Sequence, residues 1–272
     1  MVQKGVVLLL LLSVWLLVCH VVIGGTPQCE CGNYKDIEII DDDKLSETIA
    51  QVRKEFMSTV AISKFDRLDV TVLLPNRGDK KSWSRGSFNP RQLSYPASCV
   101  KLAYLIGSMH WCVDVKNTRL DCVEDHAHPM ITYSDNLETG FVVDTISEQT
   151  NIYDMTNASD PRFLPWLAKR NFTQNYFREL NLIGNQIFIG KTYPTNSGEW
   201  PLGSEAVQRS YTGSNAMAPC CAASLILHTM YRLPKEQTEY AKRLLFHRHF
   251  DDWSAIAPAL PPGSKYFSYL IH

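Results

Sequence analysis

The 272-residue sequence lacks a net charge of either sign. It contains 27 lysine and arginine residues and 28 aspartate and glutamate residues, so its formal net charge at pH 7 is −1. The basic residues are dispersed along the chain and form no stripe of the kind that follows a phosphate backbone. This balance argues against a nucleic-acid-binding protein.

The sequence also has no internal repeat, no low-complexity segment and no Gly/Ser-rich linker. Such linkers mark boundaries between domains. About 245 residues remain after a hydrophobic leader, which is enough for one large core. We therefore expect a single folding domain over residues 26–272.

Metal-binding motifs with paired ligand spacing are missing as well. Two stretches, CVEDHAHP and FHRHFDDW, contain suitable side chains, namely Cys122, Asp125, His126, His128, His247, His249 and Asp251. Neither stretch has the ligand spacing of known zinc motifs. We expect no metal and no other cofactor, and we expect the adjacent Cys220 and Cys221 to pack separately on a helix rather than to form a redox pair.

A long hydrophobic run is present at the N-terminus. Lys4 precedes an apolar or small run over residues 6–19, and a Gly-Gly pair follows. This order is typical of a secretory signal peptide, here residues 1–25, and predicts a secreted or extracellular protein. The alternative is a membrane anchor, because the run extended to Ile23 approaches the length that spans a bilayer.

Two sequons, Asn157-Ala-Ser and Asn171-Phe-Thr, agree with export and predict a glycoprotein. All but one of the eight cysteines follow the leader, so an oxidising compartment would leave at least one thiol unpaired. Cys112 and Cys122 bracket a short loop that a disulfide can close. Cys99 is expected to pack as a small buried hydrophobic residue rather than to act as a nucleophile.

Hydrophobic periodicity predicts most of the secondary structure in the first half of the chain. An amphipathic helix is expected within residues 41–61, with its apolar face formed by Leu45, Ile49, Val52 and Phe56. Strand-like runs at residues 68–74 and 82–88 flank an Asn-Arg-Gly-Asp turn and predict a hairpin. A second helix begins at Ala97 or Ser98, and its buried face comprises Leu102, Leu105, Ile106 and Met109.

The second half is mostly helical by pattern. Residues 120–181 indicate helices with breaks at Pro129, at residues 157–161 and at Pro165. The glycine-rich, polar residues 189–219 show no periodicity and predict a long ordered loop. Helices are then expected at residues 219–233 and 235–249, and residues 265–271 alternate like a strand.

Ser98 and Lys101 form an S-x-x-K pair at the start of the second helix. Residues three apart on a helix share a face, and the N-terminal end of a helix carries partial positive charge that favours an alkoxide. The pattern marks Ser98 as a candidate nucleophile. The S-x-x-K pair alone does not predict an enzyme, because further catalytic residues are required.

The tripeptide Ser134-Asp135-Asn136 supplies such residues, 36 positions after Ser98. The order S-x-x-K, then S-D-N, resembles that of the class A beta-lactamase-like serine hydrolases, whose fold is shared with penicillin-binding transpeptidases. The stretches FTQNYFRELNLIGNQIF and GSNAMAPCCAASLILHTM are similar to the family's helix before its active-site loop and to its N-x-M-x-P segment. The resemblance runs from about Leu45 to Leu260 and is nearest to the exported serine hydrolase branch.

The resemblance implies an α/β fold of the α+β type, in which a helical subdomain lies beside an antiparallel sheet flanked by helices. In the family, a strand with a Lys-Thr-Gly motif follows the Pro-Pro-Gly segment. Here the sequence reaches His272 without that motif. We therefore expect a C-terminally incomplete family member whose last sheet strands are missing.

The resemblance also implies roles for four residues. Ser98 would attack a carbonyl carbon and become acylated, and Lys101 would act as the base. Ser134 would pass a proton to the leaving group, and Asn136 would hold Lys101 or the substrate amide. The backbone N–H of Ser98 would supply half of an oxyanion hole.

One catalytic residue of the class A enzymes has no counterpart at the matching position of this sequence. Class A enzymes activate the deacylating water with a glutamate, and residues 191–195 of this sequence contain none. Glu199 and Glu205 lie further along, and we expect each to be a solvated loop charge. The acyl-enzyme would then be long-lived.

Two functions follow from these features. The first is a secreted serine acyl-hydrolase or acyltransferase that acts on a small-molecule or peptide-like amide or ester. The alternative is a catalytically inactive secreted glycoprotein with the same fold that serves as a binding or decoy protein. The four retained residues favour the first function, and the missing third motif favours the second.

Overall fold

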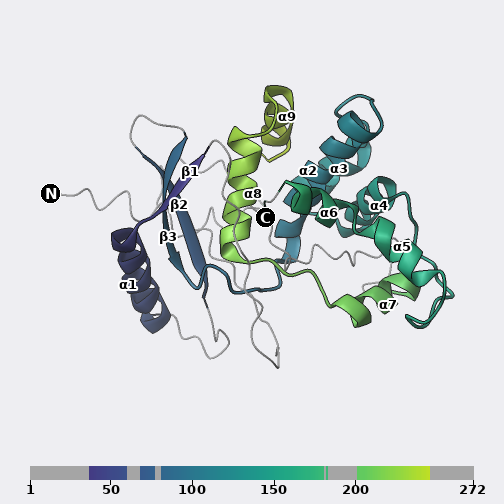
Figure 1. Ribbon diagram of the computed structural model, residues 1–272, viewed down its shortest axis with the longest axis horizontal. Coiled ribbons are helices and arrows are strands. Elements are labelled where there is room, and N and C mark those ends of the chain that lie inside the picture. Colours follow the sequence, from purple (N-terminus) through teal and green to yellow (C-terminus); the bar gives the residue numbers. More distant parts are fainter. Residues whose placement is uncertain (1–36, 60–67, 77–80, 181, 183–200, 246–272) are drawn as a thin grey trace. The chain divides into compact units, whose positions relative to one another are not determined.

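The computed structural model describes residues 37–59, 68–76, 81–180, 182 and 201–245 (Figure 1). The secondary structure is mixed α and β, with a small sheet and many helices. The chain forms two compact units, of which the first includes the described residues up to Pro96 and Met217–Ile226, and the second includes Ala97–Glu179. The leader, Glu199 and the expected strand at residues 265–271 lie outside the described residues.

The sheet in the first unit has the strand order β1-β3-β2. Strands β2 (Val70–Pro75) and β3 (Ser82–Phe88) are antiparallel, which confirms the expected hairpin. Strand β1 (Glu38–Asp41) runs parallel to β3, so the sheet is mixed and the expectation of an antiparallel sheet is wrong. A four-residue strand with only two apolar residues shows too little alternation to be recognised in a sequence.

Helix α1 (Asp43–Thr59) packs closely on β3. Asp42 caps it by accepting a hydrogen bond from the backbone N–H of Leu45 at 3.0 Å. A Cβ atom at Gly86 of β3 would lie only 2.3 Å from Cγ of Leu45 and 2.9 Å from Cδ1 of Ile49. The amphipathic helix is therefore confirmed, and glycine is required at this point of the strand.

The second unit is built around α2 (Val100–His110). A 3-10 turn, Ala97–Cys99, precedes it, and a π-helical turn, Trp111–Val115, follows. The helix thus starts where the sequence predicts. Its burial is wider than predicted, because Ala103 and Tyr104 are as fully buried as the expected apolar face, while Leu102 is only half-buried.

Helices that contact α2 in the second unit are α3 (Glu124–Thr132), α4 (Asn136–Ser147), α6 (Phe172–Glu179) and α9 (Lys235–Leu245). Helix α5 (Phe163–Arg170) contacts α4 and α6. The expected break at residues 157–161 is confirmed by the gap between α4 and α5.

The two breaks expected at prolines are wrong. Pro129 lies inside α3, and Pro165 lies in the first turn of α5. A proline in the first turn removes no helical hydrogen bond, because the N–H groups there have no partner within the helix. At Pro129 the packing of α3 on α4 and α9 outweighs the loss of one bond.

Helix α7 (Gly203–Thr212) occupies part of the segment expected to be a loop. Its buried residues are Ser204, Glu205, Val207 and Gln208, of which only one is apolar. Hydrophobic periodicity therefore gave no indication of a helix. Helix α8 (Pro219–Tyr231) and the start of α9 lie where they were expected.

A disulfide joins Cys112 and Cys122, as predicted, with the two Cα atoms 5.9 Å apart. Cys220 and Cys221 are also disulfide-bonded, and their sulfur atoms lie 3.9 Å from each other and are not joined. Cys99 is free but half-buried, not fully buried as expected. Within the described residues, no helix is long and apolar enough to cross a membrane.

Candidate active site

Ser98 lies at the N-terminal end of α2, in the 3-10 turn that leads into the helix. Its side chain is half-buried, so it is reached by solvent. The preceding residue, Ala97, has a φ angle of 46°, in the left-handed region that non-glycine residues rarely adopt. The turn therefore places the Ser98 hydroxyl at a strained point of the backbone, as is common at functional sites.

Lys101 lies in the first turn of α2 and is only 2% exposed. Its Nζ donates hydrogen bonds to the backbone oxygen of Ser134 at 2.5 Å, to Oγ of Ser134 at 3.0 Å and to Oδ1 of Asn136 at 2.9 Å. The amine is thus held by the S-D-N tripeptide. Of the two roles expected for Asn136, to hold Lys101 or the substrate amide, the contact seen here is with Lys101.

The hydroxyl of Ser134 connects the lysine to the candidate nucleophile. Oγ of Ser134 donates a hydrogen bond to Oγ of Ser98 at 2.8 Å. A continuous chain of hydrogen bonds therefore runs from Lys101 through Ser134 to Ser98. The structure brings together all four residues that the sequence singles out, and it adds the order in which they are connected.

The tripeptide is fixed in an unusual backbone conformation. Ser134 has a φ angle of 55°, and this left-handed conformation costs about 1 kcal/mol for a non-glycine residue. Asp135 then caps α4, because its Oδ1 accepts the N–H of Glu138 at 3.0 Å. The cap and the bond from Lys101 to the Ser134 carbonyl hold the strained residue in place.

Burial shifts the acidity of two groups at the start of α2. It lowers the pKa of Lys101 to about 8, and the nearby negative charge of Asp135 limits this shift. Burial raises the pKa of the Cys99 thiol, so this thiol stays protonated and is a poor nucleophile. Lys101 is the group that can exchange a proton near neutral pH.

The acceptors around Lys101 suit both of its protonation states. A charged ammonium donates three hydrogen bonds, which matches the carbonyl, the amide oxygen and the Ser134 hydroxyl. A neutral amine donates two, to the carbonyl and to Asn136, and its lone pair can accept the Ser134 proton. The same positions of the heavy atoms therefore serve a base before and after it takes up a proton.

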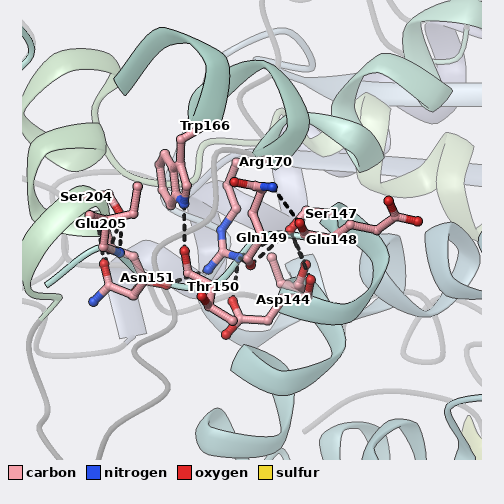
Figure 2. Close-up of polar contacts among 12 residues, drawn as sticks. Asp144, Ser147, Glu148, Gln149, Thr150, Asn151, Trp166, Arg170, Ser204 and Glu205 are labelled. Carbon is pink, nitrogen blue, oxygen red and sulfur yellow. Dashed lines mark hydrogen bonds and ion pairs between the residues drawn. The ribbon is translucent and has the colours of Figure 1, made fainter. Parts of the chain in front are cut away.

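Glu205 is not a solvated loop charge, contrary to the prediction. It lies in α7, is fully buried, and one of its carboxylate oxygens is 2.5 Å from Arg170 (Figure 2). A buried carboxylate needs a cationic partner, and this one has it. Glu205 therefore has a structural role in the second unit, and the described residues do not place it at Ser98.

Arg170 joins three helices through buried contacts. Besides Glu205 of α7, its guanidinium contacts Asp144, Oγ of Ser147 at 3.2 Å and the carbonyl of Gln149 at 2.5 Å (Figure 2). Asp144 and Ser147 lie in the last turns of α4, the helix whose first residue is Asn136. These residues are far apart in the sequence and share no motif, so sequence reasoning did not find them.

Two of the candidate metal ligands have other partners. Cys122 is in a disulfide, and Nδ1 of His126 lies 2.6 Å from Oε2 of Glu138. The stretch with His247, His249 and Asp251 lies outside the described residues. Among the residues that the structure describes, no three His, Cys, Asp or Glu side chains converge.

Comparisons with known proteins show a distant relative. No family model and no solved structure matches the chain. The chain is 27% identical over 239 residues to Golvesin of Dictyostelium discoideum, a match that covers 88% of this chain and 41% of that protein. The chain thus spans less than half the length of this relative.

Proposed function

We propose that the protein is a secreted serine acyl-hydrolase or acyltransferase that forms an acyl-enzyme on Ser98 from an ester or amide substrate. The observation that carries this proposal is the hydrogen-bond chain from the buried amine of Lys101 through Ser134 to Ser98. A serine hydroxyl needs a base to become a nucleophile, and a lysine whose pKa is lowered to about 8 can serve as one.

In the acylation step, Oγ of Ser98 forms a bond to the carbonyl carbon of the substrate. The Ser98 proton passes to Oγ of Ser134, and the Ser134 proton passes to the neutral amine of Lys101. When the bond from the carbonyl carbon to the leaving oxygen or nitrogen breaks, Ser134 delivers a proton to that atom and recovers one from Lys101. The products are an ester on Ser98 and a free alcohol or amine.

The negative charge on the carbonyl oxygen needs stabilisation during this step. The N-terminal end of α2, next to Ser98, offers backbone N–H groups and the positive end of the helix dipole. Asn136 is exposed and lies beside the lysine, so its amide nitrogen is open to a substrate carbonyl while its oxygen accepts from Lys101. These groups orient the substrate and leave the proton path unobstructed.

Deacylation uses water or another acceptor in place of the leaving group. Because Glu205 is bound to Arg170, the groups that the described residues offer for activating that acceptor are Lys101 and Ser134. The same pair then works in both halves of the reaction. This arrangement supports slow hydrolysis or transfer to an added alcohol or amine.

The test is covalent labelling of the secreted protein with a fluorophosphonate probe, followed by tryptic mass spectrometry. We expect one adduct, on Ser98, that is lost in Ser98→Ala and kept in Ser58→Ala, which removes an exposed serine of α1. An adduct on another serine would contradict the assignment. Absence of any adduct from the folded protein would favour the alternative, an inactive glycoprotein that binds a partner.

A further inference from the structure

Three large apolar side chains are exposed on the segment that carries Ser134 and Asn136. Tyr133 is 73% exposed, Leu137 is 40% exposed and Phe141 is 36% exposed. Tyr133 directly precedes Ser134, and Leu137 directly follows Asn136. Leu137 and Phe141 are one turn apart on α4 and therefore lie on the same face of the helix.

The rings of this segment also have aromatic neighbours from α3. His128 contacts the ring of Tyr133 edge-on, with the ring centres 6.1 Å apart, and His126 lies 5.1 Å from Phe141. Each end of the segment therefore has an aromatic neighbour on α3, Tyr133 beside His128 and Phe141 beside His126. We call the surface of Tyr133, Leu137 and Phe141 the apolar strip.

The charged side chains of the segment that carries the apolar strip are both acidic. Asp135 and Glu138 both lie between Tyr133 and Phe141 in the sequence, and the N–H of Glu138 binds the Asp135 carboxylate. His126 is paired with Glu138 at 2.6 Å, and Lys101 is buried and bound to the tripeptide. A second carboxylate brought to this segment would meet like charges.

We infer that the site accepts uncharged esters or amides with an apolar acyl group and discriminates against substrates that carry a carboxylate near the reacting carbonyl. The inference rests on the proposed function. Tyr133 and Leu137 flank the residues that contact the nucleophile and base, so an acyl chain bound to Ser98 can lie against them. The carboxylates of Asp135 and Glu138 repel an anionic substrate and so cause the discrimination.

The first experiment compares two esters of nearly equal size. 4-Nitrophenyl butyrate is neutral, and mono-4-nitrophenyl succinate ends in a carboxylate at the corresponding position. We expect kcat/KM for the butyrate to exceed that for the succinate by about tenfold at low salt, and the ratio to fall as salt screens the carboxylates. A fluorescent penicillin, which is anionic, should label Ser98 more slowly than a neutral fluorophosphonate.

The second experiment tests the apolar strip with acyl chains of different length. Tyr133→Ser and Leu137→Ser should each reduce the preference for 4-nitrophenyl hexanoate over the acetate by about three- to tenfold, because the longer chain loses its contact. Tyr153→Ser and Leu164→Ser are matched controls, since these residues are 57% and 59% exposed elsewhere in the second unit. The controls should leave the preference unchanged.

The third experiment tests whether the negative charge of Glu138 disfavours an anionic substrate. Glu138→Gln should raise kcat/KM for the succinate by about two- to fivefold and leave the butyrate value nearly unchanged. Glu47→Gln, in an exposed position of α1, is the control.

The outcomes separate the two claims. Equal or faster reaction of the succinate or the penicillin, or unchanged chain-length preference in both strip variants, would overturn the substrate class while Ser98 acylation stands. No Ser98 adduct from any of the neutral or anionic probes would overturn the acyl-enzyme proposal, and the substrate class with it.

Discussion

Lys101 makes the proposed chemistry dependent on pH in a defined direction. Only the neutral amine can take a proton, and burial lowers the pKa of Lys101 to about 8. We expect the rate of Ser98 acylation to rise about tenfold per pH unit below 8 and to level off above it, as measured with a neutral fluorophosphonate. In Lys101→Met the labelling rate should no longer rise with pH in this way. The variant should also be labelled about 10²- to 10⁴-fold more slowly.

The same shift affects stability. The pKa of Lys101 is lower in the folded state than its ordinary value of 10.5, so the unfolded chain binds more protons between about pH 8 and 10.5. The contribution of Lys101 to the free energy of unfolding therefore increases with pH across this window. Lys101→Met should flatten this part of the stability profile, measured by urea denaturation.

Ser134 is expected to act in series with Lys101. Because its hydroxyl lies between Lys101 and Ser98, Ser134→Ala should slow acylation about as much as Lys101→Met. The double variant should be little slower than either single variant, since each change breaks the same path. Additive losses in labelling rate would show that Lys101 reaches Ser98 by a separate route.

The residues of this site were predictable from the sequence because, within each motif, they lie close together along the chain. Ser98 and Lys101 are one helical turn apart, and the Ser134-Asp135-Asn136 tripeptide is contiguous. Their order in the hydrogen-bond chain was not predictable. It depends on the left-handed backbone of Ser134, which contacts between segments impose and which serine does not favour by itself.

At the scale of elements, Arg170 connects α4, α5 and α7. Arg170→Met keeps much of the side-chain volume but leaves Asp144 and Glu205 buried without this cation, so we expect a loss of about 3–5 kcal/mol in the free energy of unfolding. Arg162→Met, which removes solvent-exposed ion pairs, should destabilise the protein much less, because water and salt screen such pairs. Chemical denaturation measures both, and equal losses would contradict the role of Arg170.

Elements were predictable in proportion to how apolar their buried faces are. Helix α1 buries an apolar face and was predicted within a few residues. Helix α7 buries one apolar residue, Val207, beside Ser204, Glu205 and Gln208, and Ser204 and Glu205 make a hydrogen bond and an ion pair with distant residues. Its position depends on those partners, which no pattern within the segment reveals.

At the scale of the whole molecule, the two sequons differ in their surroundings. Asn157 is exposed, in the connection between α4 and α5. In the other sequon, Thr173 is only 4% exposed, and a Cβ at Gly107 would lie 3.0 Å from its Oγ1. The packing of α6 on α2 thus removes this threonine from the surface.

We therefore expect the protein, when expressed through the secretory pathway, to carry a glycan at Asn157 and not at Asn171. Removal of N-glycans with an endoglycosidase should change the mass by one glycan. Asn157→Gln should abolish that change, and Asn171→Gln should preserve it. A glycan found at Asn171 in the folded, secreted protein would show that modification precedes the docking of α6.

The set of acceptors around Lys101 has a consequence for the speed of proton movement. Taking up or releasing a proton at the amine requires only that the hydroxyl hydrogens of Ser134 and Ser98 rotate, because every heavy atom already has a partner in both states. The reorganisation energy of the transfer is then small. In the proposed reaction, a proton passes from Ser98 through Ser134 to Lys101 and back without movement of the heavy atoms, so a new turnover needs no conformational change at these residues.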